Sequence, residues 1–581
     1  MTKPIDIIKH FLPNGTGIRG QSKHKPFPVW PPDMFAVCAR LIEMSNAYTL
    51  LLEWPNVGAN SNGRNNLEVL VQIGEIWREQ GYLETNQSGG RFVQREWDKI
   101  LNSTDSISTN VISTEDIVEW KLSALRLTII SDVACSGIGF LQVGSKSSSY
   151  ASWIEVIYYG LNNSDFRSNI KTKTSYRSWY EAVYDLALAK VNETKGDWDN
   201  NTACIMVPSS IACVQPKTRT PSVGCTLRSV THHLALLPAD SQVKVKWHDP
   251  IISDNRNKPF NILFIPYPYS ISGKDFTPGV TGNHKNYSVF DVNQSWLNPN
   301  SGDFPGSNIA QFVGNLVNEA GQYVDHVDMI LMPELAMDVP TFDLVLEHLK
   351  LEYSQDNSFI LVSGVKEETN GKVRNVAKSA LIKGQLGVQA DQRKHHRWKL
   401  DTNQIRTYSL ADSLAVYDDW WENIDIGERK LNFIVFRQGA CFATLICEDL
   451  ARADPCQSVV RSLGPNLVIA LLMDGPQING RWPERYAMSL SDDPGCSVLS
   501  VTSLGLIERS NHFYGSNYRE VGLWRDTEHG TSSICLPNGY HGVILNLSRK
   551  TIEERTLDGR GDRSTASLWT LNGKIPIKLK G

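Results

Sequence analysis

The C-terminal half of the chain alternates short apolar runs with segments of helical periodicity, and this rhythm constrains the fold more than any other feature. "FNILFI" (260–265), "VDMILM" (327–332) and "FILVSGV" (359–365) read as strands, because each is a short apolar run bounded by turn-forming or polar residues. Uninterrupted apolar strands are typical of sheets that are covered on both faces. The pattern therefore predicts an α/β domain whose helices lie over its sheets.

Segments of helical spacing follow these runs. Residues 309–320 carry apolar side chains at helical intervals, and Ser307 is the expected N-cap. Pro340 is expected in the first turn of the next helix, because proline is tolerated at a helix start.

The same scheme recurs around one cysteine. Cys447 ends the apolar run 441–447, and Asp454 and Pro455 are expected to begin the following helix as N-cap and first helical residue. The run 466–473 then reads as the next strand.

The N-terminal half reads as mainly helical. Its clearest segment is 113–133, where a variant capping box of Ser113 and Asp116 precedes one apolar stripe at helical spacing. That stripe consists of Val118, Leu122, Leu125, Ile129 and Val133.

The length of 581 residues suffices for more than one domain. The stretch 240–257 is polar and turn-rich, which is typical of a boundary. We therefore expect a mainly α-helical domain of unassigned role over 1–245 and an α/β domain over 258–575.

Charge and hydropathy narrow the class of protein. The net charge of −4 gives no electrostatic reason to expect general binding to nucleic acid or to an anionic membrane. The first residues, "MTKPIDIIKHFLPNG", lack the apolar core of a signal peptide, and the longest apolar runs are too short to span a bilayer. These features predict a cytoplasmic protein without a membrane partner.

The ten cysteines are expected to be reduced thiols in that compartment. The nearest approach to a metal pattern is Cys204, Cys213 and Cys225 with the pair His232 and His233. Their spacing does not match common zinc modules, which favours buried thiols over a zinc site. We expect no metal ion and no organic cofactor.

Three chemically capable residues lie at or near the ends of the predicted strands. Glu334 follows the second strand, Lys394 lies in "QADQRKHHRWKLD", and Cys447 ends its strand before Glu448. Taken singly, each has an ordinary interpretation: a surface acid, a solvated basic run, a buried thiol. Chemistry in α/β domains is placed outside the carboxyl ends of strands, so their common location favours a shared site.

The order of these motifs resembles the nitrilase, or carbon–nitrogen hydrolase, superfamily. "MPEL", "RNVAKSALIKGQLGVQADQRKHH", "GACFATLICEDLARADP", "LGPNLVIALLM", "CSVLSVTSLGL" and "NGYHGVILNLS" carry the resemblance in that order, over about 258–575. It implies a four-layer α-β-β-α sandwich, preceded here by the helical domain. It also implies a Glu-Lys-Cys triad of Glu334, Lys394 and Cys447, and His396 fits the Lys-x-His pattern.

The implied chemistry is coherent. A nearby ammonium lowers the pKa of a thiol, so Lys394 would favour the Cys447 thiolate. Glu334 would act as general base, and the thiolate would attack an amide or nitrile carbon to give a thioester acyl-enzyme. Lys394 and the backbone N–H after Cys447 would stabilise the oxyanion.

The chain also departs from the family pattern. Many members have a second glutamate shortly after the lysine, whereas here Asp401 is the nearest acid and Gln404 is a candidate for the equivalent place. The tryptophan-bearing insertion 417–430 is expected to cover the pocket. Asp401, Glu448 and Trp482 are the expected substrate-binding residues.

The resemblance predicts a thiol-dependent hydrolase of a non-peptide carbon–nitrogen bond that acts on a small amide-like substrate. The alternative is a catalytically silent nitrilase-like module for assembly or ligand sensing. Acyl transfer to an amine and glutaminase activity remain open within the enzyme class. The family resemblance also implies a homo-oligomer.

"LMDGPQ…RW" with "RKHHRW" resembles nitrilase-like portions associated with bacterial defence reverse transcriptases. This implies a separate reverse transcriptase or other defence protein as partner, and a role in anti-phage defence.

Overall fold

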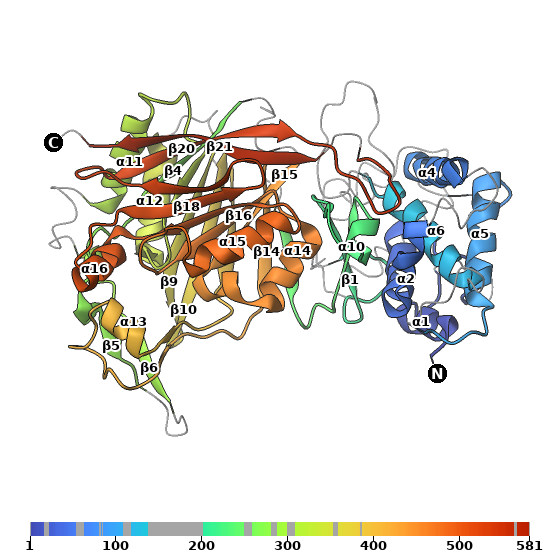
Figure 1. The fold of residues 1–581 in the computed structure, drawn as a ribbon, viewed down its shortest axis with the longest axis horizontal. Helices are drawn as coiled ribbons and strands as arrows, with labels where there is room; N and C mark the ends of the chain where they lie inside the picture. The colour runs from blue at the N-terminus through green and yellow to red at the C-terminus, as the bar shows by residue number, and fades with distance from the viewer. Residues whose placement is uncertain are drawn as a thin grey trace. The chain divides into compact units, whose positions relative to one another are not determined.

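The protein is a mixed α/β molecule of two compact units (Figure 1). The computed structural model describes residues 2–16, 23–53, 63–80, 83, 85–108, 118–136, 202–248, 258–280, 287–298, 308–352, 358–383, 386–437, 439–562 and 566–579. Unit 1 comprises Met1–Trp247, Ser462–Gly464 and Ile552–Ala566, and unit 2 comprises His248–Arg461, Pro465–Thr551 and Ser567–Gly581. The segment Ile552–Ala566, which we had assigned by sequence to the C-terminal domain, thus belongs to unit 1.

Helices are the main secondary structure in the described part of unit 1, which also has a short antiparallel strand pair, β1 and β2. The elements are α1 (Pro4–Phe11), α2 (Pro31–Ser45), η1 (Ala47–Glu53), α4 (Gly63–Gln80), α5 (Ser88–Leu101), α6 (Glu119–Ala134), β1 (Cys213–Pro216), α10 (Leu227–Val230) and β2 (Leu234–Leu237).

Helix α6 is the centre of unit 1, because α2, α4 and α5 all pack against it (Figure 1). A close approach by α4 depends on Gly74, where a Cβ atom would lie 2.7 Å from the Cβ of Val133. The surrounding core buries large aromatic side chains, which supply much of the apolar area removed from water. They include Trp30, Trp77, Trp97 and Trp120.

The predicted apolar stripe accounts for only part of the buried surface of α6. Leu125 and Ile129 of the predicted stripe are buried, but Ser123, Thr128 and Asp132 on other faces are buried too. Neighbouring helices surround α6, so its polar residues also lie inside the unit. The predicted cap, Ser113 with Asp116, and the first residues of the predicted helix lie outside the described residues.

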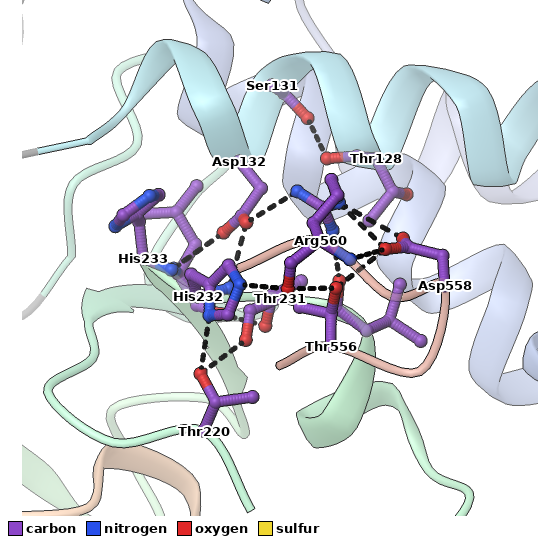
Figure 2. Close-up of polar contacts among 12 residues, drawn as sticks. Thr128, Ser131, Asp132, Thr220, Thr231, His232, His233, Thr556, Asp558 and Arg560 are labelled. Carbon is purple, nitrogen blue, oxygen red and sulfur yellow. Dashed lines mark hydrogen bonds and ion pairs between the residues drawn. The ribbon is translucent and has the colours of Figure 1, made fainter. Parts of the chain in front are cut away.

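Asp132 of α6 organises the polar interior of unit 1 (Figure 2). Its carboxylate accepts hydrogen bonds from the backbone N–H groups of His232, His233 and Leu234 at 2.9–3.0 Å. It also pairs with Arg560 at 3.5 Å, and Asp132 is fully buried. One carboxylate therefore fixes the backbone that enters β2 and the segment that carries Arg560.

The ring of His232 extends the same network (Figure 2). Nδ1 lies 2.9 Å from Thr220 Oγ1, and Nε2 lies 3.0 Å from the carbonyl oxygen of Arg560. The Arg560 guanidinium is held by Asp558 at 3.0 Å. Buried polar groups need such partners, because each unpaired one costs about 1–3 kcal/mol.

Unit 2 is built on β-sheets. The first large sheet has the strand order β11-β10-β9-β7-β4-β20-β21, and β8 pairs with β9. The second large sheet contains the strands β19-β18-β17-β16-β15-β14 in that order. A small third sheet has the order β12-β13-β6-β5. The strands are β4 (Phe260–Phe264), β5 (Phe276–Pro278), β6 (Ser288–Val292), β7 (Met329–Leu331), β8 (Met337–Asp338), β9 (Ser358–Thr369), β10 (Lys372–Lys383), β11 (Leu386–Arg393), β12 (Lys399–Leu400), β13 (Trp420–Glu422), β14 (Lys430–Arg437), β15 (Ala440–Ile446), β16 (Leu467–Leu472), β17 (Ser497–Thr502), β18 (Glu520–Asp526), β19 (Gly530–Cys535), β20 (Gly542–Thr551) and β21 (Ser567–Ile577). The strands predicted by sequence are confirmed, with small differences at their ends.

The two large sheets pack on one another through an aromatic cluster. The ring of Phe436 on β14 lies 4.7 Å from that of Phe260 on β4 and 5.0 Å from that of Trp569 on β21. Arg437 and Asp328 form a buried ion pair of 2.6 Å beside these rings. The aromatic contacts join sheets that share no strand hydrogen bonds.

Helices contact both large sheets. Helix α12 (Val339–Glu352) packs on β9 and α11 (Ile309–Ala320) contacts β21, whereas α15 (Trp482–Asp492) packs on β17 and β18. Unit 2 also contains α13 (Thr402–Thr407) and α16 (Leu504–Tyr514), and α14 (Ser458–Leu463) begins in it.

Two predicted helix starts need correction. The N-cap of α11 is Asn308, whose side chain accepts a hydrogen bond from the backbone N–H of Gln311; the predicted cap, Ser307, lies outside the described residues. After Cys447 the chain forms a π-helical turn with extended backbone at Asp454, and α14 is assigned only from Ser458. In the described part of the chain, no helix has the length and apolar character needed to cross a bilayer.

Replacing Asp132 should destabilise unit 1. Asp132→Ala removes the acceptor of three backbone N–H groups and leaves the buried Arg560 without one of its carboxylates, so we expect a loss of about 3–5 kcal/mol in unfolding free energy. Equilibrium urea unfolding followed by tryptophan fluorescence measures this loss. Asp105→Ala, at an exposed aspartate with only local hydrogen bonds, is the control and should change little. Equal stabilities of the two variants would contradict the role of Asp132.

Candidate active site

Cys447 lies at a strained turn directly after β15. Its φ is 47°, in the left-handed region that a residue with a side chain rarely occupies, and η5 (Cys447–Ala451) begins there. The residue is 2% exposed, and a backbone hydrogen bond from Met473 reaches it. Strain of this kind costs roughly 1–3 kcal/mol and is concentrated at functional sites.

Lys394 follows the end of β11 and is fully buried. Its Nζ lies 2.8 Å from Glu334 Oε1 and 2.6 Å from Glu422 Oε2. Burial alone would disfavour the ammonium, but the charges of Glu334 and Glu422 outweigh it and hold the pKa of Lys394 well above its usual range. The lysine is therefore a permanent buried cation at neutral pH.

Glu334 occupies the turn after β7, and this turn is closely fitted to β9. Leu335 has a φ of 53°, and Gly364 of β9 donates its N–H to the carbonyl of Pro333. A Cβ atom at Gly364 would lie 2.4 Å from the Cα of Glu334. Only glycine therefore allows the carboxylate-bearing turn to approach the strand this closely.

Glu422, which the sequence did not single out, is the second carboxylate in contact with Lys394. It lies on β13, 28 residues after Lys394, inside the insertion 417–430 that we expected to cover the pocket. The strand pairs with β6 and β12, and this small sheet carries Glu422 to the lysine. No local motif marks Glu422 as a site residue. The one signal in the sequence was an acidic residue directly after two tryptophans in a short strand.

Asn375 joins the two carboxylates. Its side-chain Nδ2 donates to Glu334 Oε1 at 2.8 Å and to Glu422 Oε1 at 2.9 Å, and its backbone carbonyl oxygen accepts from the backbone N–H of Lys394 at 2.8 Å. Glu334 Oε1 thus has two donors, whereas Glu334 Oε2 is buried without a hydrogen-bond partner. One carboxylate oxygen of the cluster is available to accept a proton.

Charges in the cluster act on both the acid and the thiol. Burial raises the pKa of Glu334; Lys394 opposes this and Glu422 adds to it. Burial and then Glu334 raise the pKa of the Cys447 thiol well above its usual range, whereas Lys394 lowers it. Cys447 is thus close enough to Glu334 and Lys394 to respond to both charges.

Asp449 connects the turn of Cys447 to the loop of Lys394. Its buried carboxylate accepts from the backbone N–H groups of His395 and His396 at 3.0–3.1 Å, and His396 Nδ1 lies 3.0 Å away. Because Asp449 is two residues beyond the cysteine, these bonds fix the distance between the two loops.

The expected substrate-binding residues lie in different surroundings, and of the three Glu448 adjoins Cys447. Asp401 caps α13 by accepting from the backbone N–H of Gln404, so its carboxylate is engaged at its own helix, whereas the second carboxylate on Lys394 is that of Glu422. Glu448 follows the cysteine, raises its pKa and pairs with Arg452 at 2.6 Å. Trp482 is the first residue of α15, and its ring contacts Tyr486.

One trio in the described part of the chain, His395, Asp449 and Cys456, lies close enough to share a metal ion. His395 Nδ1 is 3.0 Å from Cys456 Sγ, a hydrogen-bonding distance, and Asp449 already accepts backbone N–H groups. The trio thus satisfies its own polar atoms.

Two of the three thiols of the loose Cys/His pattern lie against backbone carbonyl oxygens, and Cys225 is half-buried. Cys204 Sγ lies 3.5 Å from the carbonyl oxygen of Pro32, and Cys213 Sγ lies 3.6 Å from that of Ser209. The ring of His232 is engaged by Thr220 and Arg560, as described above.

Comparisons with known proteins give only distant likenesses. No family model and no curated protein matches the chain. Among solved structures, Saccharomyces cerevisiae Nit3, a member of branch 10 of the nitrilase superfamily, is 10% identical over 51% of this chain and 92% of its own, with a TM-score of 0.31. XC1258 from Xanthomonas campestris, a CN-hydrolase superfamily protein, is 11% identical over 47% and 81%, with a TM-score of 0.24.

A third similar structure is a glutamine-dependent NAD+ synthetase from Acinetobacter baumannii. It is 14% identical, covers 42% of this chain and 38% of its own, and has a TM-score of 0.25. All three TM-scores lie below 0.5, so these likenesses alone establish neither the fold nor the function of this chain.

Gly364→Ala should disturb the cluster. The added methyl group meets backbone atoms of Glu334, Leu335 and Pro333, which cannot rotate away, so we expect a loss of about 1–3 kcal/mol in unfolding free energy. Urea unfolding tests this. Gly573→Ala is the control, because its Cβ would meet only an ordinary contact of 3.7 Å to Asn546. Equal stabilities of the two variants would show that the turn of Glu334 tolerates displacement.

Two charge-removing variants should move the reactivity of Cys447 in opposite directions. Glu334→Gln removes a charge that opposes the thiolate, so alkylation of Cys447 by iodoacetamide should begin at lower pH. Lys394→Met removes a charge that favours the thiolate, so alkylation should begin at higher pH. Each shift should be about one pH unit. Alkylation is measured by mass spectrometry across pH. Lys378→Met, which breaks a 2.8 Å pair with Asp391 on the adjacent strands, is the control. Shifts of the same sign would refute this electrostatic arrangement.

Proposed function

We propose that this protein is a thiol-dependent hydrolase of a non-peptide carbon–nitrogen bond, with Glu334, Lys394 and Cys447 as catalytic residues. The observation that carries the proposal is the oxygen of Glu334 that lacks a partner beside a buried ammonium and a strained cysteine turn. A buried carboxylate oxygen without a donor is uncommon in a purely structural network. It fits a group that receives a proton during a reaction.

The reaction begins with proton transfer. Glu334 Oε2 takes the thiol proton of Cys447, and the resulting thiolate attacks the carbonyl carbon of an amide. The carbonyl π electrons move to oxygen, and Lys394 with the backbone N–H of Glu448 stabilises that oxyanion. Glu334 then returns its proton to the nitrogen as the carbon–nitrogen bond breaks, which leaves a thioester and free ammonia or amine.

Hydrolysis of the thioester completes the cycle. Glu334 accepts a proton from water, the hydroxide equivalent attacks the thioester carbon, and the thiolate leaves. Glu334 then returns that proton to the departing thiolate, which restores the thiol and the carboxylate, and the carboxylic acid product loses its own proton to solvent. The raised pKa of Glu334 suits this role, because a general base works best when its pKa approaches the working pH.

The proposal includes the architecture and associations that the sequence resemblance implies. The placement of α11 and α12 on one sheet and α15 on the other supports a four-layer α-β-β-α sandwich, and the helices of unit 1 support a separate helical domain. A cytoplasmic homo-oligomer, a separate reverse transcriptase as partner and a role in anti-phage defence stay predictions.

A silent assembly or ligand-sensing module is the second candidate. The 2% exposure of Cys447 and its raised pKa favour this alternative, because both reduce nucleophile access and the resting thiolate fraction. The hydrolase hypothesis requires that the substrate reaches the buried thiol of Cys447 and that Glu334 deprotonates this thiol.

Ammonia release from a panel of primary amides and nitriles tests the proposal. Wild type should release ammonia, and Cys447→Ala should reduce the rate at least about a thousandfold, because the covalent route is lost. Cys441→Ala, the same substitution at a buried residue earlier on β15, should retain activity. Equal activity of wild type and Cys447→Ala would exclude the covalent mechanism. No ammonia from any compound, together with an unreactive Cys447, would favour the silent module.

A further inference from the structure

The two carboxylates around Lys394 have unequal hydrogen bonding. Glu334 Oε1 accepts from Lys394 and Asn375, and Glu422 Oε2 accepts from Lys394 and the backbone N–H of Trp398. Glu422 Oε1 accepts from Asn375 alone, and Glu334 Oε2 has no partner. Both carboxylates contact the lysine equally well, so the lysine by itself does not distinguish them.

Asn375 supplies the distinction. We propose that Asn375 is a positioning residue: its amide group holds Glu334 and Glu422 around Lys394 so that one oxygen, Glu334 Oε2, stays available for proton transfer. This inference rests on the proposed function, because it assigns a reason for the unpartnered carboxylate oxygen, Glu334 Oε2.

The orientation of the amide is fixed by its surroundings. Asn375 is 1% exposed, and a flipped side chain would direct its oxygen at two carboxylates instead of its two N–H groups. Each N–H therefore serves one carboxylate. An amide is neutral, so it bridges the acids without adding charge to a cluster that already buries one ammonium between two carboxylates.

The backbone of Asn375 supports the same role. Its carbonyl oxygen accepts from the backbone N–H of Lys394, and the next residue on β10, Val376, is in register with Arg393 of β11. The side chain and the backbone of one residue therefore fix both the acids and the loop of the lysine. A change at this position should alter charge placement at Cys447 without removing any group of the triad.

Asn375→Asp is the decisive variant, because it keeps the size of the side chain. It replaces both N–H donors with acceptors and introduces another negative charge beside Glu334 and Glu422. Negative charge there opposes the thiolate, so the pH midpoint of Cys447 alkylation by iodoacetamide should rise by roughly one to two units.

Asn466→Asp is the matched control. Asn466 is also 1% exposed, but its amide donates to the carbonyl oxygen of Ser567 and accepts from the backbone N–H of Cys441, at the far end of the sheet strands from Cys447. The same substitution there should lower stability and leave the alkylation midpoint unchanged.

A charge-restoring pair separates positioning from packing. Asn375→Asp combined with Glu422→Gln exchanges an amide and a carboxylate, which restores the number of buried charges and the bridge between the side chains. Its midpoint should return to that of wild type, whereas Glu422→Gln alone should lie below it. If Asn375→Asp does not fold, the comparison of the pair with Glu422→Gln still measures the effect of the asparagine.

The proposal is overturned if Asn375→Asp shifts the midpoint no more than Asn466→Asp, or if the pair does not differ from Glu422→Gln. Alkylation needs no substrate, so this result is independent of ammonia release. A protein that releases no ammonia but shows the expected midpoints would lose the hydrolase assignment and keep the role of Asn375 in ordering the cluster. Ammonia release without the midpoint shifts would keep the hydrolase assignment and remove the proposed role of Asn375.

Discussion

One buried ammonium organises the candidate site. Lys394 is fully buried, and its position is tolerable only because Glu334 and Glu422 lie within 2.8 Å of its nitrogen. An isolated charge in such a place would cost several kcal/mol, so the lysine and its acids must be assembled together or not at all. The site is therefore a product of the complete fold of unit 2.

The fold meets this demand by placing each side chain of the cluster just beyond or at the end of a strand. Glu334 follows β7, Lys394 follows β11, Glu422 ends β13 and Cys447 follows β15. Strand ends are rigid, yet the turns beyond them leave the regular backbone. At Cys447 and Leu335 they do so through left-handed conformations, which aim side chains where a regular strand could not.

Buried aspartates hold distant backbone segments in both units. Asp449 accepts N–H groups from the lysine loop in unit 2, as Asp132 does from the entry to β2 in unit 1. Asp33 of α2 likewise accepts the N–H groups of residues 205–207. A carboxylate can accept several N–H groups at once, so one side chain satisfies a short irregular segment that has no strand or helix partner.

Local patterns in the sequence determined the strands of unit 2, the helices that follow them, and Glu334, Lys394 and Cys447 as candidates. Periodicity and strand-end chemistry are properties of neighbouring residues, so they can be read without coordinates. Glu422, the bridge through Asn375, the need for glycine at 364 and the unpartnered oxygen of Glu334 were decided only by the tertiary structure. Each depends on segments that meet across sheets, such as β13 with β6 or β7 with β9, and no local spacing encodes such a meeting. Asp401 shows the same limit. It lies near Lys394 in the sequence, which suggested that it replaces the second family glutamate, but its side chain instead caps the N-terminus of α13.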